Sequence, residues 1–499
     1  MTLTEARAAL AALETTLHAY RHALGCLSVD GETAAPRNSA AGRGQTMAVL
    51  AGVVHEKLTA PSTREVIDTL YANRDALDGA VLRRAELLKE QSDELTLVPA
   101  EEYMAYERLL AEAGAVWQDA KRASDFAAFA PYLEKIVDYN RRLAARKDAS
   151  RPAYDVLLDL YEKGASCEML DPFFALLRSE LTPLILAVGE KPRPDTSFLN
   201  HTFAVDRQRI LTDRVMALMG IDRADCAAAE SEHPFTDGFN NHDVRITTHY
   251  HEDAVLSSVY SVIHEGGHAL YELGVADELQ GTLLAGGSSM GVHESQSRFY
   301  ENLIGRSLPF CRALLPILRD VFPEDFAGVT PERLYRAVNL AGPSLIRTEA
   351  DELTYAMHVM VRYELEKAMI GGDLQVCDLP GEWNAMYKKY LGLDVPDDRR
   401  GVLQDSHWSG GAIGYFPSYA LGSAYGAQML TVMEREVAVW DHVAAGDLAP
   451  VTAWLRDRIH RHGQRLTPAQ LVENACEGPF DPTYFVNYLR KKFTALYAL

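Results

Sequence analysis

Residues 253–274 read DAVLSSVYSVIHEGGHALYELG, and this stretch decides how the rest of the chain is interpreted. Apolar residues recur at the spacing of one helix face, at Val255, Val259, Val262, Ile263 and Leu270. Asp253 is a suitable N-cap, and Gly274 is a suitable C-cap. The stretch therefore predicts a helix that begins after Asp253 and ends at Gly274.

Two histidines, His264 and His268, lie four residues apart in this helix. Both imidazoles then project from one face and reach the same metal ion, while Glu265, rotated by about 100°, can approach a water molecule on that ion. An H-E-x-x-H string also arises by chance in roughly a few per cent of chains this long. Residues elsewhere must therefore complete the site before metal binding is inferred.

Gly266 and Gly267 stand between the two histidines. Each costs roughly 1 kcal/mol relative to Ala inside a helix, so their presence needs a reason. Close approach of another backbone is one explanation, and packing of a neighbouring helix on a narrow face is the other. The sequence leaves both open.

A catalytic zinc ion takes three protein ligands and leaves one position open for water. A second helix is predicted to begin near Ser289, and it offers His293, Glu294 and Glu301. We prefer Glu294, because an acidic ligand on the following helix completes a set of two histidines and one glutamate. Spacing alone does not exclude the other two, and a solvated helix face is the commoner role of any single acidic residue.

One segment departs from the helical pattern that dominates the chain up to about residue 230. Residues 242–250, HDVRITTHY, alternate and are rich in β-branched residues, with Val244, Ile246 and Thr248 on one side. Such a strand either offers an edge to an extended substrate or packs in a small structural sheet. We predict a mainly α fold with a small sheet near the histidine helix, organised as one unit over residues 1–499 with room for two lobes around a cleft.

Composition argues against several classes of partner. Lys and Arg number 49 against 70 Asp and Glu, and the resulting net charge of −21 repels phosphate backbones and anionic membrane surfaces. The six cysteines are far apart and form no C-x-x-C pair, which is typical of reduced thiols. Neither a signal peptide nor an apolar run of membrane-spanning length is evident, so we expect a cytoplasmic protein with no nucleic-acid or membrane partner.

Peptide hydrolysis needs a base and an oxyanion donor beside the metal. Zinc polarises the scissile carbonyl and lowers the pKa of its water towards ~7, while Glu265 takes the proton and passes it to the leaving amine. Tyr, His or Arg usually stabilises the oxyanion. Residues 401–426, GVLQDSHWSGGAIGYFPSYALGSAYG, offer His407, Tyr415 and Tyr419. A Gly/Tyr-rich loop packed on the core would have a similar sequence.

Several further motifs follow one another along the chain. They are HPF at 233–235, DVRIT at 243–247, HEGGH at 264–268, HESQSR at 293–298, IRTEADELTY at 346–355, QDSHW at 404–408 and GYFPSY at 414–419. In this combination the chain resembles the carboxypeptidase Taq family of metallocarboxypeptidases, the M32 peptidases. It departs from the Trp-Asp-x-x-Thr segment of that family, because residues 29–33 read VDGET. This departure puts in doubt a local packing role for the tryptophan.

The resemblance implies an almost all-α fold with a deep substrate groove, and usually a homodimer. It also implies one divalent metal per chain, Zn²⁺ with Co²⁺ as an alternative, and removal of single residues from the free C-terminus of peptides with broad preference. Holding that carboxylate requires a cation, ideally a forked guanidinium. By resemblance Arg347 is the first candidate and Arg245 the second, although salt bridges to Asp351 or Asp243 would also explain these arginines.

The remaining site residues are assigned by the same resemblance. Tyr419 is the first oxyanion donor, followed by His407 and Tyr415, and His233 lines the site. Asp351 and Asp405 are expected to orient the metal ligands, since a ligating imidazole usually donates its other N–H to a carboxylate or carbonyl.

Two rival functions remain open on the sequence. A zinc oligopeptidase or dipeptidyl carboxypeptidase on a similar helical fold would share the metal, Glu265 and the groove, and would differ in its dependence on the chain end. A non-catalytic zinc-stabilised scaffold would keep the helix but would need neither Glu265 nor an open fourth position.

Overall fold

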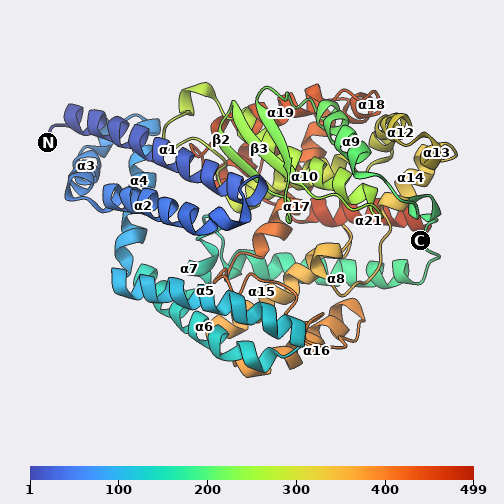
Figure 1. The fold of residues 1–499 in the computed structure, drawn as a ribbon, viewed down its shortest axis with the longest axis horizontal. Coiled ribbons are helices and arrows are strands. Elements are labelled where there is room, and N and C mark those ends of the chain that lie inside the picture. The colour runs from blue at the N-terminus through green and yellow to red at the C-terminus, as the bar shows by residue number, and fades with distance from the viewer.

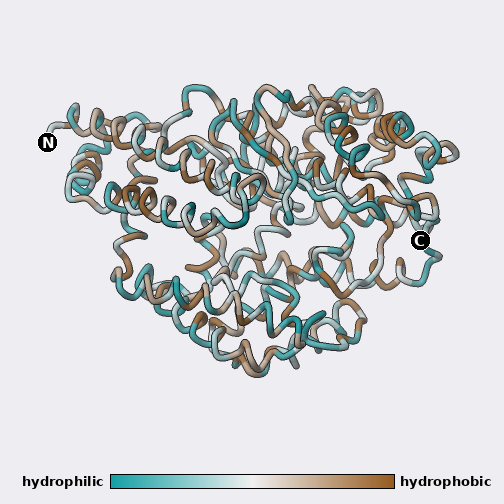
Figure 2. Tube along the Cα trace, viewed as in Figure 1, coloured by the Kyte–Doolittle hydropathy of each residue, from teal (hydrophilic) through white to brown (hydrophobic).

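In a computed structural model, residues 1–499 fold into 21 α-helices and one three-stranded sheet (Figure 1). The prediction of a mainly α fold with a small sheet is therefore confirmed. Hydrophobic and hydrophilic residues are mixed along most helices (Figure 2), as expected of helices that each bury one face. Buried apolar side chains form two clusters, a large one that begins at Ala113 and a small one that lies mainly in the first 88 residues.

The large cluster is built by the helices from α5 to the C-terminus. These are α5 (Ala100–Ala123), α6 (Phe126–Asp148), α7 (Ala153–Leu158), α8 (Cys167–Gly189), α9 (Val205–Leu218), α10 (Val255–Gly274), α11 (Met290–Arg298), α12 (Leu308–Val321), α13 (Pro323–Phe326), α14 (Pro331–Val338), α15 (Tyr355–Gly371), α16 (Leu379–Leu391), α17 (Pro417–Glu436), α18 (Val439–Ala444), α19 (Ala449–Arg458), α20 (Pro468–Cys476) and α21 (Thr483–Tyr497). Near the centre, α11 packs against both α10 and α17.

The first four helices pack together at the N-terminal end of the molecule (Figure 1). They are α1 (Leu3–Thr33), α2 (Ala40–Thr59), α3 (Pro61–Ala72) and α4 (Gly79–Leu97). Their small core is completed by Val275, Leu279, Leu283 and Leu284, from the segment between α10 and α11. Buried Glu14 of α1 forms an ion pair with Arg84 of α4 and accepts a hydrogen bond from the backbone N of Leu283 at 3.1 Å. The N-terminal helices therefore rest directly on the connection between α10 and α11.

The sheet has the strand order β1, β3, β2. β1 (Cys226–Glu230) runs parallel to β3 (Asp243–Thr248), whereas β2 (Thr236–Asn240) runs antiparallel to β3. Val244, Ile246 and Thr248 of β3 are buried, and so is Thr247 on the other side of the strand. Because α10 packs against both β2 and β3, the edge strand β2 lies beside the histidine helix.

The two helices that carry the histidine and glutamate motifs begin close to the predicted positions. α10 spans Val255–Gly274, but its N-cap is Ala254 rather than Asp253, and no side chain caps it. α11 follows Ser289, whose Oγ accepts a hydrogen bond from the backbone N of Val292 at 3.1 Å. After α11 the chain continues as a π-helix over Phe299–Ile304.

One helix, α8, is long and apolar enough to cross a membrane by length and composition. This corrects the expectation that no apolar run reaches that length. Core helices often meet the same criterion, so α8 alone is weak evidence of a membrane span. All six cysteines are free thiols, as the sequence predicted.

Candidate active site

Three side chains converge between α10 and α11. His264 and His268 extend from α10 and Glu294 from α11, and one ligand atom of each lies within 4.8 Å of the other two. The Nε2 atoms of His264 and His268 lie 3.7 and 3.6 Å from the same atom, Oε2 of Glu294. Two imidazole nitrogens and a carboxylate oxygen suit zinc and other divalent first-row metals. These residues, the metal-ligand group, could therefore hold a metal ion.

The two other candidate ligands lie behind the imidazoles. Nδ1 of His264 lies 2.9 Å from Oε2 of Glu301, and Nδ1 of His268 lies 2.7 Å from Nδ1 of His293. Glu301 stands in the π-helix, a distortion that is frequent at functional sites. His293 and Glu301 therefore contact the outer nitrogens of the imidazoles, and Glu294 completes the metal-ligand group.

The carboxylates expected to orient the imidazoles bind other groups. Asp351 accepts hydrogen bonds from the backbone N of Gly342 and Leu353 and from Thr354. Asp405 forms ion pairs with two arginines. The outer imidazole nitrogens face Glu301 and His293 instead, because these lie on the segment that packs directly against α10.

Positive charge balances the buried carboxylates of this site. Nε of Arg298 donates to Glu294 at 2.8 Å, and Nη2 of Arg306 donates to Glu301 at 3.1 Å. Burial raises the pKa of both carboxyls, but the arginines and His264 outweigh it and hold the two pKa values well below their usual range. Burial also works to lower the pKa of His264, yet Glu294 and Glu301 raise it to about 8. Both carboxylates are therefore ionised, as ligands or acceptors require.

The two helix glycines have different structural reasons. A Cβ on Gly267 would lie 2.6 Å from the backbone O of Gln296 and 2.7 Å from Cα of Ser297, so the backbones of α10 and α11 meet here. A Cβ on Gly266 would instead lie 2.7 Å from Sδ of Met219, a side chain. Backbone approach thus explains Gly267, and side-chain packing explains Gly266. The close approach at Gly267 brings Glu294 within reach of the histidines.

Glu265 lies against the sheet and is 7% exposed. Its Oε2 accepts a hydrogen bond from Oγ1 of Thr236 on β2 at 2.6 Å, and the same hydroxyl lies 3.0 Å from the Glu265 carbonyl O. His233 is exposed, and its carbonyl accepts from Oγ of Ser231 at 2.7 Å. The HPF motif therefore begins in the bend that leads into Thr236. The contact between Thr236 and Glu265 was not identified from the sequence.

A second buried group is formed by Arg347, Arg362 and Asp405, which we call the arginine group. Arg347 is 5% exposed, and its Nε and Nη2 donate to Oδ1 of Asp405 at 3.0 and 2.9 Å. Its Nη1 donates to the hydroxyl of Tyr355 at 2.8 Å. Nε of Arg362 donates to the other oxygen of Asp405 at 2.6 Å. The partner of Arg347 is thus Asp405 rather than Asp351.

Aromatic side chains join the arginine group to the metal-ligand group. The guanidinium of Arg347 lies 5.1 Å from the ring of Tyr419, and the guanidinium of Arg298 lies 4.2 Å from the ring of Tyr355. Because Arg298 binds Glu294 and Tyr355 binds Arg347, the two groups are neighbours.

His407, Tyr415 and Tyr419, which the sequence offers within one run, lie together in the structure. Nε2 of His407 lies 3.3 Å from the Tyr419 hydroxyl, and the rings of Tyr415 and Tyr419 are 5.1 Å apart. Burial, then Arg347, lowers the pKa of His407 to about 4, so this imidazole is neutral at pH 7. Burial raises the pKa of both tyrosines, which keeps their hydroxyls protonated. A neutral histidine and two phenols can all donate hydrogen bonds to a substrate.

Arg245 is paired within the sheet. Its Nε and Nη2 donate to Asp243 at 3.1 and 3.2 Å, and its guanidinium lies 4.8 Å from the ring of Phe239. The structure therefore contains the salt bridge from Arg245 to Asp243 that the sequence left open as an alternative.

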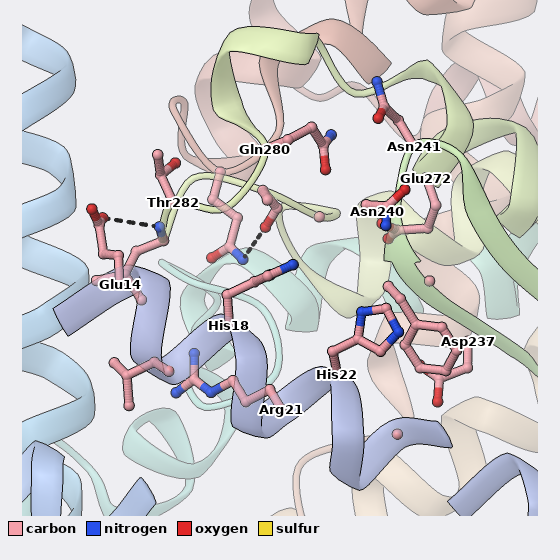
Figure 3. Close-up of a pocket in the computed structure, with 18 of the residues that line it drawn as sticks. Glu14, His18, Arg21, His22, Asp237, Asn240, Asn241, Glu272, Gln280 and Thr282 are labelled. Atoms are coloured by element: carbon pink, nitrogen blue, oxygen red, sulfur yellow. Dashed lines mark hydrogen bonds between the residues drawn. The ribbon is translucent and has the colours of Figure 1, made fainter. Parts of the chain in front are cut away.

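Close to Arg245, a polar cavity of about 270 Å³ lies between α1, β2 and the segment after α10. In Figure 3, His18 and His22 of α1 point toward this cavity, and Glu272 lies on its opposite side.

Known proteins are similar to this chain over almost its whole length. The sequence model of the family described as carboxypeptidase Taq (M32) metallopeptidase matches residues 9–493. Carboxypeptidase 1 of Bacillus subtilis is 37% identical over 482 residues, 96% of each chain, and thermostable carboxypeptidase 1 of Thermus thermophilus is 37% identical with the same coverage. The crystal structure of an M32 carboxypeptidase from Deinococcus radiodurans superposes with a TM-score of 0.96 at 37% identity, over 99% of this chain and 100% of the other.

Proposed function

Because this chain belongs to the carboxypeptidase Taq (M32) family and is a metallocarboxypeptidase, we propose that it uses zinc to release single residues from the free C-terminus of peptides, with broad preference. The observation that carries this proposal is the convergence of His264, His268 and Glu294 beside Glu265. These three ligands would hold the ion and leave a fourth position open. When bound, the metal supplies Lewis-acid polarisation of the scissile carbonyl and of a water molecule.

Glu265 acts as the general base in this proposal. Its Oε2 is held by the Thr236 hydroxyl, which leaves Oε1 to accept a proton from the attacking water. The same carboxyl then delivers that proton to the leaving amine. Burial of Glu265 against β2 supports this role, because exclusion of bulk water protects the proton transfer.

Arg347 holds the substrate carboxylate in this proposal. A guanidinium has five N–H groups, and Arg347 uses three of them on Asp405 and Tyr355, so two remain for a ligand. Asp405 also shares its charge with Arg362, so the arginine group keeps a net positive charge to offer an anion. Arg245 is the weaker candidate because Asp243 neutralises it. The Tyr419 hydroxyl, with His407 and Tyr415 beside it, is the proposed oxyanion donor, and His233 is proposed to line the site.

Further parts of the proposal rest on the family and the composition rather than on the site. We propose Zn²⁺ as the metal, with Co²⁺ as the alternative, a homodimer, and a cytoplasmic location. The six free thiols support a reducing compartment. The net charge of −21 supports the expectation that nucleic acid and anionic membranes are not partners.

The test is digestion of peptides of one sequence, with a free or an amidated C-terminus, by metal-loaded and chelator-treated enzyme, read by mass. The expected result is a ladder of single-residue losses from the free peptide, which the amide and the chelator both abolish. Loss of residue pairs would instead indicate a dipeptidyl carboxypeptidase, and internal cleavage of the amide would indicate an oligopeptidase. Absence of any metal-dependent cleavage would favour the scaffold.

A further inference from the structure

The two histidines of the metal-ligand group have chemically different partners on their outer sides. His264 meets a carboxylate, Glu301, at 2.9 Å. His268 meets a second imidazole, because Nδ1 of His293 lies 2.7 Å from Nδ1 of His268. Nε2 of His293 in turn lies 2.8 Å from Oε1 of Glu272. A chain of three side chains, His268, His293 and Glu272, therefore leads away from the metal position.

The positions of the protons in this chain follow from metal binding. An imidazole that gives its Nε2 lone pair to a metal keeps its proton on Nδ1. His268 then donates from Nδ1, so Nδ1 of His293 must accept. A neutral imidazole that accepts at Nδ1 carries its proton on Nε2, and Oε1 of Glu272 accepts that proton. Only one set of tautomers satisfies both contacts.

Glu272 is the member of the chain that excludes the other tautomer of His293. With its proton on Nδ1, His293 would present an N–H to the N–H of His268 across 2.7 Å, and its Nε2 lone pair would face a carboxylate. Both contacts would be repulsive. The carboxylate therefore acts on His268 through His293, without touching the metal-ligand group itself.

Both outer residues are held firmly in place. Glu272 stands one turn after His268 on α10, and the backbone N of Gly287 donates to its Oε1 at 3.1 Å. A Cβ on Gly287 would lie 2.4 Å from Cδ2 of His293, so only glycine lets this loop close over the imidazole. A Cβ on Gly238 of β2 would lie 2.8 Å from Cγ of Glu272. Figure 3 shows Glu272 from the cavity side, near Asn240.

We propose that His293 and Glu272 are positioning residues that fix the tautomer of His268 and thereby raise the affinity of the chain for its metal. This proposal rests on the proposed function only in so far as His264, His268 and Glu294 hold a metal. His293 supplies the acceptor, and Glu272 sets the orientation of that acceptor. His264 needs no such relay, because Glu301 is a direct acceptor already ionised by Arg298 and Arg306.

The test is the dissociation constant of Zn²⁺ from the full-length chain, measured by competition with a chromophoric chelator. Glu272→Gln and His293→Phe should each weaken Zn²⁺ binding about 10- to 100-fold, the range for loss of an outer partner of a metal ligand. The double variant should be no weaker than the weaker single variant, because both changes break one chain. Glu278→Gln, an exposed carboxylate just after α10, is the matched control and should bind Zn²⁺ as the native chain does.

A conservative variant separates positioning from folding. His293→Asn keeps an acceptor near the position of Nδ1 but loses the contact to Glu272, so it should bind Zn²⁺ more tightly than His293→Phe. Adding Glu272→Gln to His293→Asn should then change nothing further. The Co²⁺-loaded Glu272→Gln variant should show altered visible absorption, while its metal-free unfolding midpoint matches the native one.

Several results would overturn the inference. These are native Zn²⁺ affinity in both Glu272→Gln and His293→Phe, an equal loss in Glu278→Gln, or additive losses in the double variant. A native chain that binds no Zn²⁺ would instead refute the proposed metal site itself, so the two failures are distinguishable.

Discussion

The metal-ligand group and the arginine group are neighbours and both are buried, but different features of the chain hold them. The metal-ligand group comes from two consecutive helices, and helical spacing already places His264 beside His268. The arginine group joins a residue before α15, a residue within α15 and a residue after α16. Local spacing thus sets the geometry of the metal ligands, whereas ion pairs between distant segments hold the arginine group together.

The loop that carries His407 and Tyr415 is held by two buried side chains of α15. Arg362 binds Asp405 at the start of the loop. One turn later, Glu366 accepts hydrogen bonds from Nε1 of Trp408 and the backbone N of Gly414, both at 2.8 Å. The loop is therefore held by two buried ionisable side chains, whereas the metal-ligand group is held by a pair of helices.

The largest effect should come from the metal side of the comparison. Glu265→Gln removes the proposed base but leaves the three ligands, so kcat should fall about 10²- to 10⁴-fold while Zn²⁺ stays bound. Steady-state kinetics on a free-ended peptide and metal analysis of the same sample check both parts. Glu278→Gln serves as a control and should retain native kcat. Turnover within tenfold of the native rate would contradict the assignment of Glu265 as the base.

The second effect concerns the arginine group. Arg347→Lys keeps the charge but loses the forked donor, so one charged hydrogen bond of about 1.5–3 kcal/mol is lost and kcat/KM should fall roughly 10- to 100-fold. The measurement is kcat/KM for a peptide with a free C-terminus, together with the Zn²⁺ content of the variant. Only kcat/KM should change. Arg245→Lys is the matched control, and a larger loss there would move the carboxylate site to the sheet.

The metal-ligand group was largely predictable because its signal is local. An i, i+4 pair on a helix puts His264 and His268 on one face in any fold that keeps the helix. Glu294 followed from the need for a third ligand on the next helix. The outer partners were not predictable: Glu301 reaches His264 from a π-helix, and helical spacing does not reveal where a π-helix interrupts an α-helix.

The arginine group could be listed from its motifs but not assembled. Arg347 and Asp405 were both singled out, yet their pairing depends on how α15 and α16 fold between them. Arg362 lies in a helix that is buried almost throughout, so no amphipathic pattern marks it. Thr236 was not identified from the sequence for a similar reason, because its contact with Glu265 forms only when β2 packs on α10. Contacts between distant segments carry no spacing signal.

The smallest effect is a change in the pH dependence of stability on the arginine side. Burial raises the pKa of Glu366 to about 7, although Trp408, Gly414 and Tyr154 favour its ionised form. The pKa of a glutamate in the unfolded chain is about 4.3. Between this pKa and that of the folded chain, folded Glu366 holds a proton that the unfolded chain has lost. Stability contributed by this group therefore falls as pH rises from about 4.5 to 7. The amide side chain of Glu366→Gln does not ionise, so this variant does not show that loss of stability.

The stability of Glu366→Gln relative to the native chain should therefore improve as pH rises from 5 to 7.5, by up to roughly 3 kcal/mol. Unfolding in urea at the two pH values measures it, and the similar contribution of buried Glu162, whose pKa burial also raises to about 7, cancels in the difference. Glu364→Gln, on the same helix and paired with Arg178, is the control. A relative stability that stays the same at the two pH values would mean that Glu366 is ionised throughout this range, and that the loop is held as tightly by charge at pH 5 as at pH 7.5.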